Sequence, residues 1–282
     1  MKALITGAGG QVGRALVASA PAAWSCVPLT RAELDVTNRD AVERAVATYA
    51  PDLIINAAAY NAVDRAETDQ ATAFAVNGEA VGALAGTARE IGAHFVHIST
   101  DFVFDGKASQ PYRSHDRPSP LSVYGASKLA GEQAAGPEAT VVRTSWVYAP
   151  GNANFLSSLL SLMLEREELR VVSDQIGSPT WAMALAQMLW RLSSDRRAGL
   201  WHYADEGQTS RYEFAIAMAE EARALGLIAR APRIIPITTE TLQSTARRPA
   251  FSPLDSAATH AALDTEPAPW RANLRRMLAE QV

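Results

Sequence analysis

A tyrosine and a lysine four residues apart, Tyr124 and Lys128, are the residues of this chain whose types and spacing best suit chemistry. A spacing of four places both side chains on one face of a helix, one turn apart. A phenol with a pKa of about 10 is a poor proton shuttle at neutral pH, but a neighbouring ammonium favours the phenolate and lowers that pKa. The pair predicts a proton-transfer site. Such pairs also arise by chance on amphipathic helices, so a second feature is needed.

That second feature is a glycine-rich turn near the amino terminus, with glycines at Gly7, Gly10 and Gly13. The spacing differs from the Gly-x-Gly-x-x-Gly of the common dinucleotide fingerprint. It meets related demands, namely a tight turn, close approach of the backbone to a pyrophosphate and a helix packed near the strand. Backbone amides and the positive end of the helix dipole favour an anion there. We interpret the turn as a dinucleotide site; the alternative is a strand-to-helix turn without a ligand.

Alternating strands and helices must position these residues. Apolar runs predict strands over residues 3–6, 24–29, 53–56, 95–99 and 140–143, and helical periodicity falls at 12–20, 40–49, 71–91 and 123–134. This alternation predicts an α/β fold, a Rossmann-type doubly wound parallel sheet with helices on both faces. Ligands of such sheets bind beyond the carboxyl ends of the strands. The polar motifs follow the predicted strands at Gly7, Asn56, Ser99 and Thr144.

The second half of the chain has a looser pattern. Helices are predicted over residues 155–165, 182–192, 211–225 and 271–280, and short strands over 170–172, 200–203 and 234–237. We therefore expect a dinucleotide-binding domain over residues 1–150 and a smaller α/β substrate lobe over 151–282, interleaved with the first.

Composition and charge bound the function class. The chain has 282 residues, 48% of them hydrophobic and 20% charged, with a formal net charge of −4. These values are ordinary for a globular protein and give no reason to expect nucleic acid or a membrane as partner. The apolar runs are too short to span a bilayer. A single cysteine, Cys26, excludes an internal disulfide and suggests the cytoplasm; we expect it to be inert core.

Longer blocks of sequence resemble one family. These are Gly-Gly-Gln-Val-Gly (9–13), Asn-Ala-Ala-Ala-Tyr-Asn-Ala-Val-Asp-Arg-Ala-Glu (56–67), Ser-Thr-Asp-Phe-Val-Phe-Asp-Gly (99–106), Tyr-Gly-Ala-Ser-Lys-Leu-Ala-Gly-Glu (124–132), Arg-Thr-Ser-Trp-Val-Tyr (143–148) and Ser-Asp-Gln-Ile-Gly-Ser-Pro-Thr (173–180). Together they resemble the extended short-chain dehydrogenase/reductase superfamily and, within it, the dTDP-4-dehydrorhamnose reductases. The resemblance covers essentially the whole chain, and the block at 173–180 is the most selective.

The resemblance implies a catalytic set of Thr100, Tyr124 and Lys128. Tyr124 would donate the proton, Lys128 would hold the nicotinamide ribose and lower the pKa of the phenol, and Thr100 would hydrogen-bond the substrate carbonyl. The alternative for Thr100 is a hydroxyl that only caps a backbone amide at the end of a strand.

Cofactor contacts are implied along the first three strands. NADPH, with NADH as the second choice, is expected because no carboxylate ends the second strand, where NAD enzymes bind the ribose. Arg31 would then take the 2′-phosphate, unless it is simply a solvated loop residue, and Asp35 would accept from the adenine amine. The expected cofactor-binding residues are Gly7, Gly10, Gln11, Val12, Gly13, Arg31, Asp35, Val36, Ala57, Ala58, Ala59, Tyr60, Tyr124 and Lys128.

Sugar and diphosphate contacts are implied further along the chain. Trp146 would wall the sugar site, with a core aromatic as the alternative, and arginine side chains suit phosphate oxygens. For Asp101 a local loop hydrogen bond is an equal alternative. The expected substrate-binding residues are Thr100, Asp101, Phe102, Tyr124, Trp146, Asn154, Arg211 and Arg248.

The expected function is NADPH-dependent reduction of the C4 ketone of dTDP-4-dehydro-L-rhamnose to dTDP-L-rhamnose, for surface polysaccharide. Two rivals remain open, a nucleotide-sugar epimerase or dehydratase on the same scaffold and a non-catalytic regulatory subunit. Asn61 and Ser122 depart from the residues usual in the family, which puts the sugar fit in doubt. The histidines show no ligand spacing with cysteines or acids, so no metal site is expected. A homodimer is the expected assembly.

Overall fold

A parallel sheet forms the centre of the molecule. The structure is a computed structural model that describes residues 1–151 and 155–281. Its main sheet has the strand order β10-β5-β4-β3-β1-β2 with every pair parallel, which confirms the predicted doubly wound architecture. The strands are β1 (Lys2–Thr6), β2 (Ser25–Leu29), β3 (Leu53–Asn56), β4 (His94–Thr100), β5 (Thr140–Thr144) and β10 (Gly199–His202).

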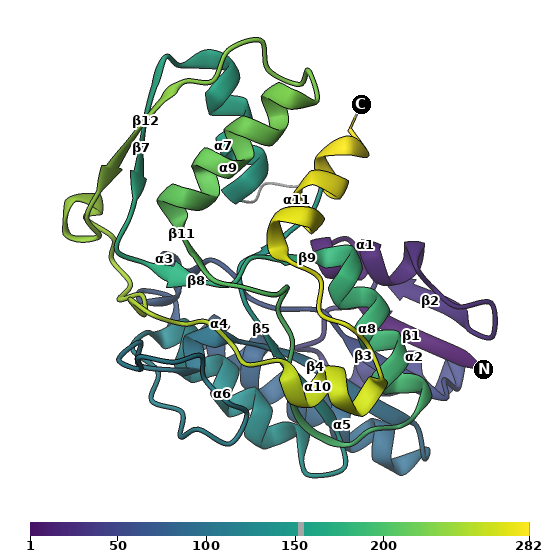
Figure 1. Ribbon diagram of the computed structural model, residues 1–282. Coiled ribbons are helices and arrows are strands. Elements are labelled where there is room, and N and C mark those ends of the chain that lie inside the picture. The colour runs from purple at the N-terminus through teal and green to yellow at the C-terminus, as the bar shows by residue number, and fades with distance from the viewer. Residues whose placement is uncertain (152–154, 282) are drawn as a thin grey trace.

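Helices cover both faces of this sheet (Figure 1). On one face α1 (Gln11–Ala18) and α8 (Ala182–Ser194) share a core with the strands, through residues such as Leu16 and Trp190. On the other face α2 (Arg39–Tyr49) and α5 (Ala80–Glu90) enclose a second core that includes Val42 and Leu84. Cys26 lies in β2 and is half-buried, packed against the first core in which we expected it.

The long helix predicted over residues 71–91 is interrupted. It consists of α4 (Gln70–Phe74), a π-helical turn η1 (Ala75–Glu79) and α5. The turn buries Asn77 and Gly78 against α6 (Val123–Ala135), where a Cβ on Gly78 would already lie 3.4 Å from the Ala130 Cβ. Apolar periodicity did not reveal this turn, because one extra residue in a helical turn hardly changes the pattern.

A smaller layer packs beyond the carboxyl ends of the main strands (upper part of Figure 1). Its core joins α7 (Phe155–Glu165), α9 (Arg211–Ala224) and α11 (Trp270–Ala279) to the parallel pair β7 (Glu168–Val172) and β12 (Arg233–Ile237). Strand β10 belongs to the main sheet and helix α8 packs against it, although both come from the second half of the chain. The division at residue 150 therefore stays a prediction.

Several short elements were not predicted because one or two turns of helix, or two paired residues, leave no periodic signal. They are α3 (Val63–Ala66), η2 (Asp101–Val103), β6 (Val147–Tyr148), β8 (Ile176–Gly177), β9 (Thr180–Trp181), β11 (Thr209–Ser210), η3 (Glu240–Leu242) and α10 (Ala257–Leu263).

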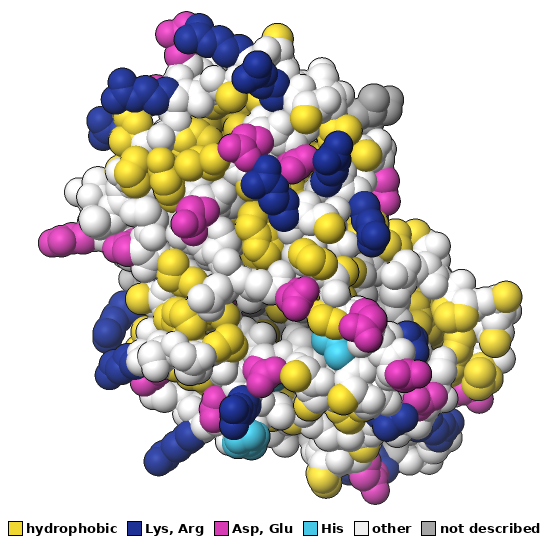
Figure 2. Space-filling model, in the orientation of Figure 1, with side chains coloured by type: hydrophobic (Ala, Val, Ile, Leu, Met, Phe, Trp, Pro, Cys, Tyr) yellow, Lys and Arg dark blue, Asp and Glu magenta, His cyan; other side chains and the backbone are white. Residues whose placement is uncertain are grey.

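Basic and acidic side chains are interspersed over the face seen in Figure 2, with apolar side chains between them. No continuous basic stripe is visible on that face. Within the residues that the structure describes, every helix is too short or too polar to cross a membrane.

Candidate active site

The predicted cofactor residues meet at the carboxyl ends of β1, β2 and β3. They line a cavity of about 300 Å³, here called the nucleotide cavity. The predicted residues on its wall are Gly7, Gly10, Arg31, Asp35, Val36, Ala57, Ala58, Ala59 and Tyr60.

The glycine turn fits a closely approaching ligand. Gly7 has a φ of +64°, and a Cβ there would lie 2.6 Å from the backbone nitrogen of Ala58. A Cβ on Gly13 would collide with the carbonyl of Gly7, so this glycine lets α1 pack directly on the turn although it does not line the cavity. Gly10 is the N-cap of α1, and the helix therefore points its positive end at the cavity. This cradle suits the pyrophosphate of a dinucleotide.

The end of β2 carries no free carboxylate for a ribose. The carboxylate of Glu33 accepts hydrogen bonds from the backbone nitrogen and the hydroxyl of Thr30 at 2.8 and 2.7 Å, and it does not line the cavity. Arg31 is exposed on the cavity wall. Asp35, also on the wall, accepts two hydrogen bonds from Thr37, which lower the pKa of its carboxyl.

A second cavity of about 520 Å³, here called the central cavity, adjoins the first. The two share Gly10, Asn61 and the alanines at 57, 58 and 59. The predicted residues on its wall are Gln11, Val12, Thr100, Asp101, Phe102, Tyr124, Lys128, Trp146, Arg211 and Arg248. The structure thus brings together nearly all of the predicted site; Asn154 lies outside the described residues.

Thr100, at the end of β4, connects the candidate proton donor to the loop that follows. Its hydroxyl donates to Asp101 Oδ1 at 3.0 Å, accepts from the backbone nitrogen of Phe102 at 3.2 Å, and interacts with the phenol of Tyr124. Thr100 therefore caps a backbone amide, as in the alternative interpretation, and also lines the central cavity beside Tyr124. The ring of Phe102 meets that of Tyr124 edge to face, with centroids 5.4 Å apart.

The expected lowering of the tyrosine pKa is wrong for this structure. Burial raises the pKa of Tyr124 to about 12 and outweighs the hydrogen bond with Thr100. Lys128 is buried too, and its Nζ donates to the carbonyl of Ile98 at 2.5 Å and lies 3.4 Å from His97 Nε2. Burial lowers the pKa of Lys128 to about 8, although the nearby Glu132 carboxylate opposes that change. The four-residue spacing of Tyr124 and Lys128 in the sequence could not predict that both side chains are buried away from water.

Asp101 is almost fully buried, and Ser252 was not expected beside it. The serine hydroxyl donates to Asp101 Oδ2 at 2.6 Å. Burial raises the pKa of Asp101 to about 6, against the effect of its hydrogen bonds from Ser252 and Thr100. Residue 252 is far away in the chain, and no local pattern predicts the pairing.

Trp146 forms one wall of the central cavity. Its backbone has a φ of +45°, and its indole fills the space where Gly177 lacks a side chain. The guanidinium of Arg211 lies over the indole, 3.5 Å from the ring centroid, and 4.9 Å from that of Phe155. Burial lowers the pKa of Arg211 to about 9, so the group stays charged at neutral pH. The partly exposed indole suits a pocket wall better than a core position.

Arg248 already has a carboxylate partner. It forms a two-pronged ion pair with Asp64, with nitrogen–oxygen distances of 2.6 and 3.2 Å. Burial disfavours ionisation of Asp64, but hydrogen bonds from Ala246, Arg248 and Ser244 together lower its pKa to about 2. A diphosphate at this position would have to share Arg248 with Asp64.

Asn77 in the π-helical turn is a further site residue that the sequence did not predict. Its amide exchanges hydrogen bonds with the backbone of Tyr60 at 2.9 and 3.1 Å and donates to the hydroxyl of Ser127 at 3.0 Å. It therefore holds the strand end at the nucleotide cavity against the helix of Tyr124 and Lys128. An asparagine in the middle of an apparent helix gave no signal of this role.

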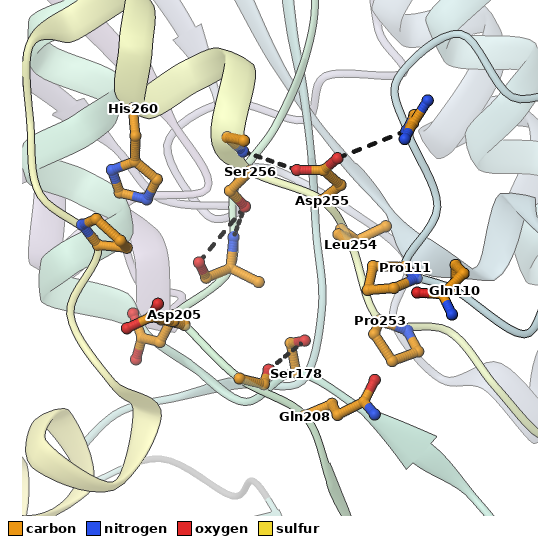
Figure 3. Close-up of a pocket in the computed structure, with 16 residues that line it drawn as sticks. Gln110, Pro111, Ser178, Asp205, Gln208, Pro253, Leu254, Asp255, Ser256 and His260 are labelled. Carbon is orange, nitrogen blue, oxygen red and sulfur yellow. Dashed lines mark hydrogen bonds and ion pairs between the residues drawn. The ribbon is translucent and has the colours of Figure 1, made fainter.

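A further cavity, of about 730 Å³, lies elsewhere (Figure 3). It is lined by the segments around Gln110, Asp205, Pro253 and His260 and contains none of the predicted site residues. Its wall adjoins the central cavity at one point, because the hydroxyl of Ser145 donates to the carbonyl of Ser178 at 2.5 Å. Among the described residues, no group of three histidine, cysteine or acidic side chains could hold a metal ion.

Comparison with known proteins finds relatives that match the whole chain. Residues 1–282 match the family of the RmlD substrate binding domain. A dTDP-4-dehydrorhamnose reductase of Burkholderia thailandensis is 43% identical over 285 residues, with 96% of each chain covered. Two solved dTDP-4-dehydrorhamnose reductases superpose closely. That of Clostridium acetobutylicum has a TM-score of 0.93 at 34% identity and covers 100% of this chain and 99% of its own. That of Bacillus anthracis, in complex with NADP, has a TM-score of 0.92 at 33% identity and covers 99% of each.

With the glycine cradle, the Thr100–Tyr124–Lys128 set and these relatives in place, the chain belongs to the dTDP-4-dehydrorhamnose reductase family of extended short-chain dehydrogenases/reductases.

Proposed function

We propose that the chain reduces the C4 ketone of dTDP-4-dehydro-L-rhamnose with NADPH and yields dTDP-L-rhamnose for surface polysaccharide. The observation that carries the proposal is that Thr100, Tyr124 and Lys128 line one cavity that shares part of its wall with the glycine-lined nucleotide cavity. A relative from Bacillus anthracis with NADP bound supports the choice of cofactor.

Residues of both cavities would hold NADPH, which supplies the hydride when bound. The glycine turn and the N-terminus of α1 would bind the pyrophosphate, and Arg31 would bind the 2′-phosphate. Lys128, with Nζ already fixed by Ile98, would meet the nicotinamide ribose.

Tyr124 would give its proton to the ketone oxygen. The hydroxyl of Thr100, which donates to Asp101 Oδ1 in the structure, would turn to donate a hydrogen bond to the same ketone oxygen. Because both side chains line the cavity, they would orient the ketone and stabilise the charge that develops on its oxygen. These two effects account for most of the acceleration in such reductions. Trp146 and Arg211, which also line the central cavity, would contact the sugar and the diphosphate.

The test is NADPH oxidation with dTDP-4-dehydrorhamnose against a panel of other nucleotide ketosugars. We expect turnover to be fastest with the dTDP-4-dehydrorhamnose. An epimerase or dehydratase would instead be purified with tightly held NAD and would interconvert sugars without net NADPH consumption. A non-catalytic regulatory subunit would oxidise NADPH with none of the sugars. Sedimentation of the same preparation tests the expected homodimer.

Tyr124→Phe checks the proton donor separately. The ring keeps its edge-to-face contact with Phe102 while the hydroxyl is lost. Turnover should fall by about 10² or more, the usual scale for a general acid, with NADPH affinity little changed. Near-normal turnover in this variant would overturn the assignment of Tyr124.

A further inference from the structure

Three buried polar side chains lie side by side across the main sheet. Thr6 on β1 is the register partner of Asn56 on β3, which is the register partner of His97 on β4. The hydroxyl of Thr6 donates to Asn56 Oδ1 at 2.7 Å, and Asn56 Nδ2 lies 3.2 Å from His97 Nδ1. The other ring nitrogen, His97 Nε2, lies 3.4 Å from Lys128 Nζ. The row therefore ends at the lysine of the candidate catalytic set.

The backbone determines which nitrogen of His97 carries the proton. The amide nitrogen of Ala58 can only donate, and it points at Asn56 Oδ1 at 3.2 Å. The oxygen of the Asn56 amide must therefore face Ala58 and Thr6, and the NH₂ group must face His97 Nδ1. Because that NH₂ group is a donor, Nδ1 is an acceptor, and a neutral ring then carries its proton on Nε2.

His97 is neutral. Burial and the nearby Lys128 hold the pKa of the imidazole well below its usual range. Its Nε2–H therefore faces Lys128 Nζ. An ammonium has no lone pair and cannot accept this hydrogen bond, whereas the neutral amine can.

The other ionisable groups around Lys128 also affect whether its amine is charged. Glu132, one turn further along α6, favours the ammonium, but its carboxylate is also held by Arg143 at 2.7 Å and by the hydroxyl of Ser99 at 2.5 Å. Tyr124, one turn earlier, keeps its proton because burial raises its pKa. On β4 the carbonyl of Ile98 accepts from Nζ, and His97 is the ionisable group there that contacts it.

The contact cannot easily open. Gly131 on α6 faces His97, and a Cβ at that position would lie 3.2 Å from His97 Nε2 and would collide with the carbonyl of Asn77. The absence of a side chain lets α6 approach β4 closely and keeps Lys128 against the ring.

We propose that Asn56 holds His97 as the Nε2–H tautomer, and that His97 is a positioning residue that donates this hydrogen bond to the neutral form of Lys128 and so controls the charge on that lysine. Any effect of this hydrogen bond on catalytic turnover rests on the proposed function. The protonation states themselves do not, and they can be measured on the protein without substrate.

The first measurement is made on the unaltered protein, with His97→Gln used only to assign the signal. The chain has five histidines. In folded protein labelled with ¹⁵N-histidine, the side-chain ¹⁵N resonances report which ring nitrogen of each histidine is protonated. We expect His97, assigned as the signal missing from His97→Gln, to show an unprotonated Nδ1 and a protonated Nε2 at neutral pH. A protonated Nδ1, or a charged ring, would overturn the proposal.

The second measurement follows the lysine. The chain has only three lysines, Lys2, Lys107 and Lys128, so ¹³Cε-lysine spectra can resolve each titration. In His97→Gln the side-chain carbonyl can accept from the ammonium, and we expect the pKa of Lys128 to rise by about one unit. Lys2 and Lys107 serve as internal references.

His94→Gln is the matched control. His94 is a second buried histidine on β4 whose Nε2 pairs with the hydroxyl of Thr140 at 2.8 Å rather than with Lys128. The His94→Gln substitution should leave the pKa of Lys128 unchanged. An unchanged or lowered Lys128 pKa in His97→Gln, or an equal rise in His94→Gln, would contradict the proposal. If the titrations behave as expected but no nucleotide ketosugar is reduced, the proposed function fails and this inference stands.

Discussion

Burial shifts four ionisable side chains of the central cavity towards their neutral forms. These are Asp101, with a pKa of about 6, Tyr124 at about 12, Lys128 at about 8 and Arg211 at about 9. In each case loss of water is the largest cause. A charged ligand that enters this cavity therefore meets groups whose charges are poorly solvated, and pairing with them is correspondingly favourable.

Arg31 gives a residue-scale test of cofactor choice. It is an exposed cation on the nucleotide cavity, and only NADPH carries the 2′-phosphate that it would contact. Arg31→Ala should weaken NADPH by about 1.5–3 kcal/mol, the value of a hydrogen bond to a charged group, and leave NADH almost unchanged. Binding titrations with both cofactors measure this.

Arg39→Ala is the control, because Arg39 is exposed on α2 and paired with Glu43 outside the cavity. It should affect neither cofactor. Equal losses for NADPH and NADH in Arg31→Ala would show that Arg31 is a solvated loop residue.

Trp146 gives a residue-scale test of the sugar site. Trp146→Ala should raise the Michaelis constant for the sugar, because the indole lines the central cavity, and should leave NADPH affinity intact. A core tryptophan behaves differently, since its truncation costs about 3–5 kcal/mol of stability. Trp190→Ala provides that comparison, because Trp190 is almost fully buried and donates to the carbonyl of Leu16. A similar drop in melting temperature in both variants would place Trp146 in the core.

Among the elements, α6 sets the geometry of the site by its close packing. Two of its glycines face backbone carbonyls of neighbouring turns, Gly125 that of Phe102 in η2 and Gly131 that of Asn77 in η1. In both places a Cβ would collide with the carbonyl oxygen. The helix that carries Tyr124 and Lys128 is therefore held against the strand ends at a distance that only glycine permits.

Gly131→Ala tests this packing. The added methyl group must displace backbone, and we expect a loss of about 1–3 kcal/mol in the free energy of unfolding together with reduced turnover. Gly86→Ala is the matched control. Gly86 lies inside α5 with no atom in the way of a Cβ, so alanine should stabilise the protein by about 0.5–1 kcal/mol. Chemical denaturation of both variants measures the contrast; a tolerated Gly131→Ala would show that α6 can shift.

Local patterns predicted the elements that are long and regular, and they failed where contacts are distant in sequence. The strands of the main sheet and the helix of Tyr124 were predicted to within two residues, because apolar periodicity and the glycine turn are encoded locally. The π-helical turn with Asn77, the Ser252–Asp101 hydrogen bond and the Arg248–Asp64 ion pair were not. Each depends on packing between segments far apart in the chain. The pKa of Tyr124 was misjudged for the same reason, since burial is a property of the whole fold.

For the molecule as a whole, a buried acid joins the two layers. Asp205 lies at the wall of the cavity of about 730 Å³ (Figure 3) and accepts from the backbone nitrogen of Trp181 at 3.0 Å. The side chains of Asn273 in α11 and Tyr148 in β6 lie close to its carboxylate and favour the ionised form. Burial outweighs these effects and raises the pKa of Asp205 to about 7.

This acid predicts a pH dependence of stability. Between about pH 4 and pH 7 the folded protein keeps the proton that the unfolded chain has lost, so stability falls as pH rises through this window. Asp205→Asn should remove this fall, which is on the order of a few kcal/mol. Denaturation of both proteins at pH 5 and pH 8 measures it. If the two proteins lose equal stability between these values, Asp205 is already ionised in the folded state.

Two contacts of residues that line the central cavity join segments far apart in the chain. Ser252 and Asp101 are separated by 151 positions, and Arg248 and Asp64 by 184. The glycine turn and the first three strands, in contrast, lie within the first 60 residues. At about 5–20 residues per second, a ribosome needs roughly 8–30 s to make the stretch between Asp101 and Ser252. A nascent chain can therefore assemble its glycine turn and first strands well before these contacts of the central cavity can form.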